Sequence, residues 1–192
     1  MARRYKKIHG WTGILIIILV ALYQIAQQQG WLNGTKKAVV NNQPGLYSVS
    51  RFVDGDTIGV NVNGKEEKVR LVGVDTPETH KPNTPVQCYG IAAAAFTKNS
   101  LTNQKFRLVS DSLSTDRDRY NRLLRYIYLT DGTNFNEKLV KDGYAFYYPY
   151  FPFTQSDQFA ADQATAISAH KGLWGNCSPT QTDKGGYVSN PA

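Results

Sequence analysis

The chain has 192 residues, a length that fits one domain of ordinary size with residues left over for a tail or an anchor. Hydrophobic residues make up 41% of the chain and charged residues 19%, which excludes a wholly disordered protein. Two cysteines are too few for a disulfide-dense scaffold or for a zinc site with four cysteine ligands.

The formal net charge of +7 suggests a nucleic-acid-binding protein, but the charge is unevenly distributed. Residues 1–44 contain six basic side chains and no acidic one, whereas residues 45–177 contain 15 basic and 14 acidic side chains. The single acidic and single basic side chains of residues 178–192 cancel. Almost all the positive excess therefore lies outside the region that can form a core.

The N-terminal segment combines basic residues with an apolar run over residues 11–26. The basic residues that precede the run are Arg3, Arg4, Lys6 and Lys7. Positive side chains before an apolar stretch are typical of the end that stays in the cytoplasm. A buried helix of the globular domain is the least favoured alternative, because residues 14–22 leave no polar face for water. We expect residues 1–30 to be an uncleaved membrane anchor, with a cleaved signal peptide as the alternative, so that the rest of the chain is exported.

Two further segments differ in composition from the central region. Residues 27–44 are rich in Gln, Asn and Gly without a hydrophobic period, so we expect a linker at residues 31–44. Residues 178–192 are polar and rich in Gly, Pro and Ser, which predicts a flexible tail. Residues 45–177 are left as one globular domain.

Strand and helix patterns alternate through this domain. Strands are expected at residues 46–53, 57–62, 68–74, 105–110 and 123–129, and helices at residues 91–101, 134–141 and 155–171. Asn63-Gly64 is a strong hairpin turn, and Asp131-Gly132 predicts the next turn. Three strands, a helix, two strands and two helices indicate an α+β domain. Five strands with a helix after the third suit a small closed barrel such as the OB-fold.

Three short segments contain polar groups that a bare fold does not need. Residues 54–57 read DGDT, which alone is most simply a turn. Residues 69–79 read VRLVGVDTPET and place Arg70 inside an otherwise apolar strand. Burying Arg70 is costly unless it meets an anion, and the alternative to a functional role is a salt bridge to a neighbouring carboxylate. Residues 116–122, DRDRYNR, read alone as a solvated charged loop.

Taken together, the three segments predict a site for phosphodiester hydrolysis. Asp56 and Asp75 offer hard oxygen ligands, and a backbone carbonyl of the loop could add a third ligand for Ca²⁺. Glu78 follows Asp75 by three residues, where it could act on a water molecule as a general base. Two arginines can grip a phosphate through paired hydrogen bonds and stabilise the charge that develops on it.

The region from about residue 48 to residue 174 resembles the thermonuclease family, the staphylococcal-nuclease-like domain. The matching motifs, in order, are VDGDT (53–57), VRLVGVDTPET (69–79), the Tyr-Gly pair with its alanine-rich helix (89–96), RYNRLLRYIY (119–128), NEKLVKDGYA (136–145) and GLWGNC (172–177). The resemblance implies a five-stranded OB-fold barrel with three helices. It also implies Ca²⁺-dependent endonuclease and exonuclease activity on DNA and RNA that leaves 3′-phosphates.

The resemblance also implies roles for individual residues. Asp56 and Asp75 match the calcium-binding carboxylates, and Thr76 matches the residue whose backbone carbonyl binds the ion. Glu78 occupies the position of the proposed general base.

On the substrate side, Arg70 and Arg122 match the two phosphate-binding arginines, and Tyr120 corresponds to a tyrosine beside the substrate. Asn121 stands where the family usually has Gly, a change that should do little harm because Asn tolerates left-handed backbone. For the aromatic run at residues 144–153, base stacking and packing of a long loop stay open, and no single residue is assigned.

Cys88 and Cys177 lie just before the first predicted helix and just after the third. For an exported domain we favour a disulfide between them, and two separate thiols are the alternative.

The sequence therefore predicts an exported, membrane-tethered, Ca²⁺-dependent nuclease that acts on DNA and RNA, with secretion after signal cleavage as the alternative location. A rival hypothesis is an OB module that binds nucleic acid but has lost catalysis, and a third is an anchored structural protein. The complete set of acidic residues and arginines favours the nuclease. The sequence implies no protein partner, and we expect a monomer.

Overall fold

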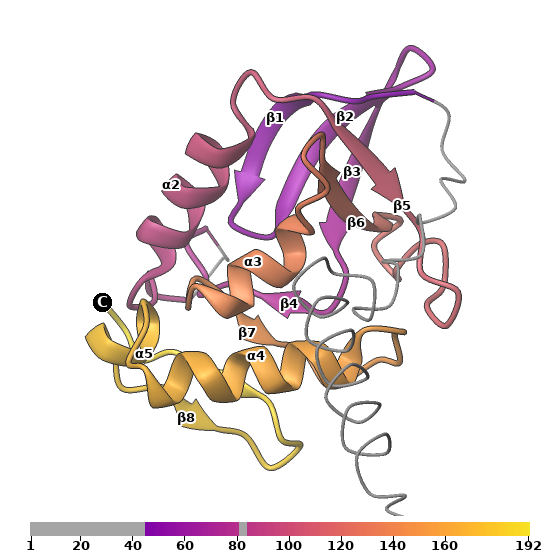
Figure 1. The fold of residues 1–192 in the computed structure, drawn as a ribbon. Coiled ribbons are helices and arrows are strands. Elements are labelled where there is room, and N and C mark those ends of the chain that lie inside the picture. The colour runs from indigo at the N-terminus through magenta and orange to yellow at the C-terminus, as the bar shows by residue number, and fades with distance from the viewer. Residues whose placement is uncertain (1–44, 81–83) are drawn as a thin grey trace, which may run out of the picture. The chain divides into compact units, whose positions relative to one another are not determined.

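A computed structural model describes residues 45–80 and 84–192 (Figure 1). The predicted anchor or signal peptide and the predicted linker lie outside these described residues. Within them, no helix has the length and apolar character needed to cross a membrane. The described chain is a mixed α+β fold, as the order of strand and helix patterns predicts.

A five-stranded sheet forms the upper part of the view in Figure 1. Its strands, in spatial order, are β1 (Val49–Asp54), β2 (Thr57–Val62), β3 (Lys65–Leu71), β6 (Leu123–Leu129) and β5 (Phe106–Val109). Neighbours are antiparallel except β3 and β6, which are parallel. The predicted turn at Asn63-Gly64 connects β2 and β3, and its two residues have φ values of 54° and 83°. Positive φ at both residues matches the right-handed twist of a two-residue hairpin.

The predicted strand at residues 68–74 is divided in two. β3 ends at Leu71, and β4 (Val74–Asp75) pairs with β7 (Phe146–Tyr147) outside the main sheet. Gly73 makes the turn between them with a φ of 76°, and a Cβ at this position would lie 2.6 Å from the ring of Phe153. The turn therefore requires glycine for its backbone angle and for space, and it brings Asp75 back beside β3.

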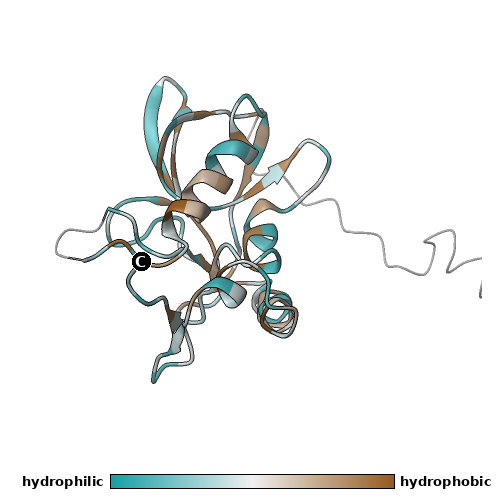
Figure 2. Cartoon of the chain, turned by 90° about the vertical axis from the view of Figure 1, so that its left-hand side faces the viewer, coloured by the Kyte–Doolittle hydropathy of each residue, from teal (hydrophilic) through white to brown (hydrophobic). Residues whose placement is uncertain are grey.

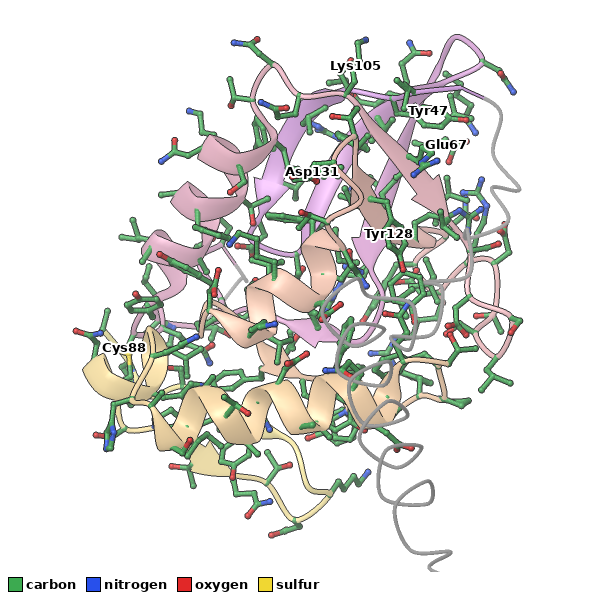
Figure 3. All side chains as sticks on the ribbon, viewed as in Figure 1. Tyr47, Glu67, Cys88, Lys105, Tyr128 and Asp131 are labelled. Carbon is green, nitrogen blue, oxygen red and sulfur yellow. A yellow bond between two sulfur atoms is a disulfide. The ribbon has the colours of Figure 1, made fainter. Side chains whose placement is uncertain are left out.

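The two edges of the sheet touch near the start of β1. The backbone N–H of Tyr47 donates to the carbonyl of Phe106 (2.8 Å), and the N–H of Phe106 donates to the carbonyl of Tyr47 (3.0 Å). Nζ of Lys105 donates to Oγ of Ser48 (2.9 Å), and Figure 3 shows Tyr47 and Lys105 at the same end of the sheet. The described strands thus form an open sheet whose two edges meet at a single bridge. They do not form the continuous closed barrel that the sequence predicts.

Three helices and one short helical turn complete the described elements. They are α2 (Gly90–Leu101), α3 (Phe135–Lys141), α4 (Ser156–Ser168) and α5 (Leu173–Asn176). Asn134 caps the N-terminus of α3, and its side chain accepts hydrogen bonds from the backbone N–H groups of Asn136 and Glu137. α4 is shorter than the predicted helix at 155–171, because His170 adopts left-handed backbone with a φ of 50° and ends the helix.

Apolar side chains from the sheet and the helices form the core. The sheet contributes the buried residues Ile58, Val60, Val69, Leu71, Leu108 and Ile127, and the helices contribute Phe135, Leu139 and Phe159. Figure 2 shows hydrophobic and hydrophilic residues mixed along the strands and helices. Because successive side chains of a strand point to opposite faces, one face of the sheet can be buried while the other meets water.

The C-terminal residues 178–192, which their composition predicts to be a flexible tail, fold back onto the domain. They form a small hairpin from β8 (Thr180–Gln181) and β9 (Tyr187–Val188). The ring of Tyr187 packs against Phe146 and Trp174, with ring centres 6.1 Å and 5.0 Å apart. Composition misses this arrangement because one aromatic residue and a set of backbone hydrogen bonds hold the segment, without a hydrophobic period.

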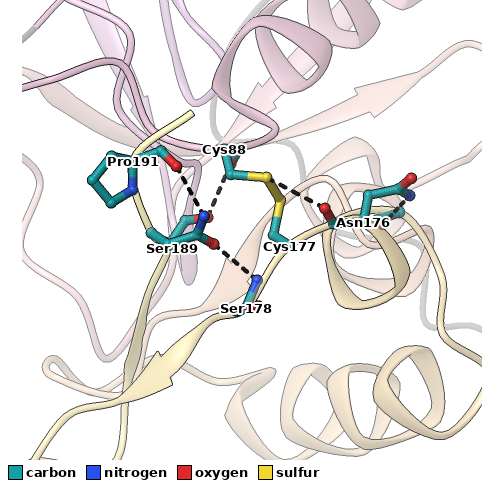
Figure 4. The surroundings of a disulfide bond; sticks show 8 residues. Cys88, Asn176, Cys177, Ser178, Ser189 and Pro191 are labelled. Atoms are coloured by element: carbon teal, nitrogen blue, oxygen red, sulfur yellow. Dashed lines mark hydrogen bonds between the residues drawn. A yellow bond between two sulfur atoms is a disulfide. The ribbon is translucent and has the colours of Figure 1, made fainter.

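A disulfide joins Cys88 and Cys177, as the sequence interpretation favours (Figure 4). The two Cα atoms are 5.9 Å apart and the residues are separated by 89 positions in the chain. The end of the chain binds at the same place, since the N–H of Cys88 donates to the carbonyl of Asn190 (2.8 Å) and Oγ of Ser189 donates to the carbonyl of Cys88 (2.9 Å). The segment before α2 is therefore held by both the disulfide and the C-terminus.

Candidate active site

Arg70 on β3 connects the two predicted carboxylates. Its Nη2 lies 3.3 Å from Oδ2 of Asp56 and 2.9 Å from Oδ1 of Asp75. Its Nη1 donates to the carbonyls of Leu71 and Val74, at 2.9 Å and 2.6 Å. Only 12% of the side chain is exposed. The salt bridge considered as an alternative role for Arg70 is thus present, and it involves both acidic residues of the predicted site.

Two opposing effects set the pKa of Arg70. Burial of the guanidinium lowers the pKa, but the charges of Asp56 and Asp75 outweigh burial and raise the pKa above its ordinary value. Arg70 therefore stays cationic. Burial and the charge of Asp56 raise the pKa of the Asp54 carboxyl, which accepts a hydrogen bond from Oγ1 of Thr79 (3.0 Å).

Asp56 is buried and ties the start of β2 to the loop after β4. Its Oδ2 accepts from the N–H of Thr76 (2.9 Å) and from Oγ1 of Thr76 (3.1 Å), and its Oδ1 accepts from Oγ1 of Thr57 (2.9 Å). DGDT therefore does more than form a turn. Asp75 differs from Asp56 because 41% of its side chain is exposed, so this carboxylate is open to solvent.

The oxygen atoms of this group fit a hard divalent cation. The carboxylates of Asp56 and Asp75 converge on one nitrogen of Arg70, and the second of them is accessible to water. Carboxylates, backbone carbonyls and water are the ligands that Ca²⁺ takes in proteins. Residues 45–80 and 84–192 contain no cluster of three or more His, Cys, Asp or Glu side chains suited to an ion. An ion bound by these two carboxylates would take its remaining ligands from backbone carbonyls, water or substrate.

Glu78 lies in the loop after β4, and its backbone is fixed by Gln87. The N–H of Glu78 donates to Oε1 of Gln87 (2.8 Å), and the N–H of Gln87 donates to the carbonyl of Glu78 (2.9 Å). Gln87 precedes the disulfide-bonded Cys88. The predicted base is thus positioned by a segment that the disulfide holds.

Asp118 orients Arg122, the second predicted arginine. The Nε of Arg122 donates to Oδ2 of Asp118 (2.6 Å), while the N–H groups of Tyr120 and Arg122 donate to Oδ1 (both 2.9 Å). Burial raises the pKa of Asp118, but these hydrogen bonds and the charge of Arg122 outweigh burial and lower the pKa. Asn121 has a φ of 63°, the left-handed backbone expected for it. The carboxylate of Asp118 therefore holds both the turn at residues 118–122 and the side chain of Arg122.

Two of the remaining charges of the segment at residues 116–122 also form ion pairs. Asp116 pairs with the buried Arg125 (2.5 Å), and Arg117 pairs with Glu67 on β3 (2.8 Å). The segment is therefore more than the solvated charged loop that it resembles in isolation, since two ion pairs attach it to the sheet although Asp116 and Arg119 are exposed.

A pocket of about 1080 Å³ brings the two arginines together with aromatic side chains. Its lining includes Arg70, Arg122, Tyr120, Tyr148, Tyr150 and Phe151. Tyr120 is 65% exposed, and its ring centre lies 5.4 Å from Cζ of Arg122. The ring centre of Tyr148 lies 5.8 Å from Cζ of Arg70. Anion-binding groups and stacking surfaces thus share one pocket.

The aromatic run at residues 144–153 is divided between the core and the lining of the pocket. Phe146 is buried and packs against Trp174, at a ring-centre distance of 5.4 Å. Tyr148, Tyr150 and Phe151 instead line the pocket. Burial raises the pKa of Tyr148, and the nearby charge of Asp75 raises it further, so its hydroxyl stays protonated.

Sequence interpretation missed three residues that position this site. Gln87 and Tyr148 contact Glu78 and Arg70 from distant segments, and no local pattern indicates either contact. Asp118 could have been found, because an acidic residue four positions before Arg122 is suitably spaced to pair with it within a tight turn.

The chain matches the family model described as Staphylococcal nuclease homologue over residues 68–176. It is 43% identical over 171 residues to a thermonuclease of Staphylococcus hyicus, a match that covers 86% of this chain and 97% of the relative. A thermonuclease of Staphylococcus intermedius is 47% identical over 137 residues, covering 70% of this chain and 78% of the relative. The endonuclease YncB of Bacillus subtilis (strain 168) is 42% identical over 153 residues, covering 78% of this chain and 68% of that protein.

Proposed function

The chain belongs to the staphylococcal nuclease family, and we propose that this nuclease hydrolyses phosphodiester bonds of DNA and RNA with Ca²⁺ and leaves 3′-phosphates. The observation that carries the proposal is the position of Arg70, which pairs with Asp56 and Asp75 and lines the same pocket as Arg122 and Tyr120. The scaffold of the site is the five-stranded sheet, whose edges meet at one bridge between Tyr47 and Phe106.

In the proposed mechanism, the two arginines bind the scissile phosphate. Arg70 is already oriented by its contacts with two carboxylates and two carbonyls, so little freedom is lost when it meets the substrate. The bond from Arg122 to Asp118 uses Nε, so the two Nη groups of Arg122 can grip phosphate oxygens. Both guanidiniums then stabilise the negative charge that develops on the phosphate in the transition state.

Glu78 is the proposed general base. It takes a proton from water as the water oxygen bonds to phosphorus and the bond from phosphorus to the 5′ oxygen breaks. The departing 5′ oxygen takes up a proton from solvent water, and the phosphate stays on the 3′ side. The two hydrogen bonds between Gln87 and the backbone of Glu78 hold the base in place for this transfer.

The proposed Ca²⁺ ligands are the carboxylates of Asp56 and Asp75 and the backbone carbonyl of Thr76. A Ca²⁺ held by these ligands would supply positive charge that stabilises the phosphate in the transition state. Arg70 neutralises the same two carboxylates within the protein, so the fold does not require the ion to hold these acidic groups together.

A cleavage assay on the purified full-length protein tests the proposal. Single-stranded DNA and RNA should be degraded with Ca²⁺ and preserved with EGTA, and the products should be blocked at the 3′ end until a phosphatase removes the phosphate. The double variant Glu78→Ala, Arg122→Ala should lose at least about 10³-fold in kcat/KM. The matched control is Arg51→Ala, Glu66→Ala, which removes an exposed ion pair and should leave cleavage unchanged. Full activity in the Glu78, Arg122 variant would refute the site assignment.

A module that binds nucleic acid without cleaving it is the alternative function. It predicts that the protein retains single-stranded DNA in a binding assay while the DNA stays intact with Ca²⁺. An anchored structural protein predicts neither binding nor cleavage. The complete set of acidic residues and arginines, most of them joined by direct contacts, supports the nuclease over both alternatives.

We also propose that the nuclease domain is exported as a monomer and tethered to the membrane through residues 1–30, with secretion after cleavage as the alternative. The support is the basic and apolar pattern of this segment and the disulfide, which is typical of oxidising compartments. Cell fractionation with mass measurement of the mature N-terminus tests it. Recovery of intact protein in the soluble cytoplasmic fraction would contradict both locations.

A further inference from the structure

The C-terminal hairpin formed by β8 and β9 is attached to the domain at both ends. Before its first strand, the disulfide fixes Cys177. After its second strand, Ser189 is buried and its Oγ donates to the carbonyl of Cys88 (2.9 Å). Between these points, Tyr187 packs on Phe146. A short segment held at three places presents its turn at a defined position.

The turn of this hairpin, residues 182–186, packs against Tyr150 and places Lys184 in the pocket lining. Oη of Tyr150 and Oγ1 of Thr182 are hydrogen-bonded at 2.7 Å, and the N–H of Thr182 donates to the carbonyl of Gly186 (2.8 Å). Gly186 lies so close to Tyr150 that a Cβ there would be 2.3 Å from Oη. Tyr150 lines the pocket with Arg70 and Arg122, and Lys184 from the hairpin turn lines it too.

Lys184 differs from most of the other cations in this pocket. The lining contains Arg70, Arg117, Arg119, Arg122 and Lys184. Arg70, Arg117 and Arg122 have carboxylate partners. Among the residues that the structure describes, Arg119 and Lys184 have no ion pair, and Lys184 is exposed. Its charge is therefore available to an anion that enters the pocket.

We propose that the hairpin is part of the substrate-binding surface and that Lys184 binds a backbone phosphate of the nucleic acid outside the scissile position. This inference rests on the proposed function. The pocket volume of about 1080 Å³ lies just above the range of about 300–1,000 Å³ typical of small-molecule sites, which leaves room for more than one nucleotide. Lysine contacts to phosphates supply affinity without reading the base sequence.

Substrate length separates this contact from the chemistry. In the full-length protein, Lys184→Ala should lower kcat/KM for a single-stranded octanucleotide about three- to tenfold, mainly through KM. The same change should leave cleavage of a dinucleotide with one phosphodiester unchanged. Lys184→Arg should restore the octanucleotide value, and Lys184→Glu should lower it further. Lys98→Ala, which removes an exposed charge from α2, is the matched control and should affect neither substrate.

Binding without cleavage gives a second measurement. Fluorescence anisotropy with a labelled octathymidylate in EGTA measures the affinity as a function of NaCl concentration. Removal of one phosphate contact should reduce the slope of log K against log salt by about 0.7 for a single strand. Thr182→Val, which removes the hydrogen bond to Tyr150, should weaken binding in the same direction but less.

The outcomes separate this inference from the proposed function. Octanucleotide kinetics of Lys184→Ala that equal those of Lys98→Ala would overturn the inference, and so would equal losses on both substrates. An unchanged salt slope in a Lys184→Ala protein that still cleaves DNA rejects the role of Lys184 alone. If the unmodified protein cleaves neither substrate but binds DNA through Lys184, the nuclease proposal fails and the binding role stands.

Discussion

Removal of the disulfide should destabilise the domain by several kcal/mol. Cys88 and Cys177 are separated by 89 positions, so the bond closes a long loop in the unfolded chain. The chain-entropy relation for a loop of this length gives about 4.5 kcal/mol at 25 °C. Since single domains are stable by roughly 5–15 kcal/mol, the bond supplies a large share of the total. The chain contains two cysteines, so no alternative pairing can replace it.

Urea unfolding of the full-length protein, compared with Cys88→Ser, Cys177→Ser, measures this contribution. With an m-value of about 2 kcal/mol per molar urea, the midpoint should fall by about 2 M. The reduced unmodified protein should match the double variant, and reductant should leave the double variant unchanged. A loss below about 1 kcal/mol would refute the reasoning, because it would mean that the unfolded chain gains little freedom when the bond is absent.

Two buried polar residues give further predictions. Asp111 accepts hydrogen bonds from Tyr126 and Thr154. These bonds outweigh the effect of burial and lower the pKa of the Asp111 carboxyl. Asp111→Asn should therefore lower the free energy of unfolding by roughly 2 kcal/mol at pH 7. Because the folded-state pKa is the lower one, this stability is present above about pH 4 and is lost as the pH falls, so equal costs in urea unfolding at pH 7 and pH 3 would contradict the assignment. Asn136 is fully buried; its side chain accepts a hydrogen bond from the N–H of Ile127 and donates one to the carbonyl of Val72. Asn136→Ala should therefore lower the free energy of unfolding by about 3 kcal/mol in the same urea measurement. The matched control, Asn99→Ala at an exposed position, should lower it by less than about 0.5 kcal/mol.

Local sequence patterns predicted the features of the fold that depend on local chemistry. Asn63-Gly64 predicted its hairpin because few other residue pairs adopt positive φ twice in succession. The helix predicted at residues 134–141 matches α3, whose first backbone N–H groups donate to the side chain of Asn134. The strands of the main sheet were predicted because their sequences are rich in residues that favour strands and are bounded by turn residues. Arg70 was recognisable because a charge inside an apolar strand requires an anion, and two carboxylates lie beside it.

Features that depend on contacts between distant segments were not predicted. β4 and β7 have two residues each, too few to show a hydrophobic period. Each is a strand only because it pairs with the other. The C-terminal hairpin was expected to be a loose tail for a similar reason. Its order depends on the packing of Tyr187 and on backbone bonds to the segment around Cys88, neither of which composition reveals. The division of the aromatic run between core and pocket also depends on the tertiary fold.

The way in which the arginines are held has an electrostatic consequence for the proposed metal dependence. Each arginine that a carboxylate orients is also neutralised by that carboxylate, as with Arg70 and Arg122. The rigid part of the site therefore attracts a polyanion weakly, in keeping with the nearly equal numbers of acidic and basic residues in the domain. A divalent cation on Asp56 and Asp75 would shift this balance at the scissile phosphate itself. Under the proposed function, Ca²⁺ and the phosphate should then bind cooperatively, since each favours the site that the other has occupied.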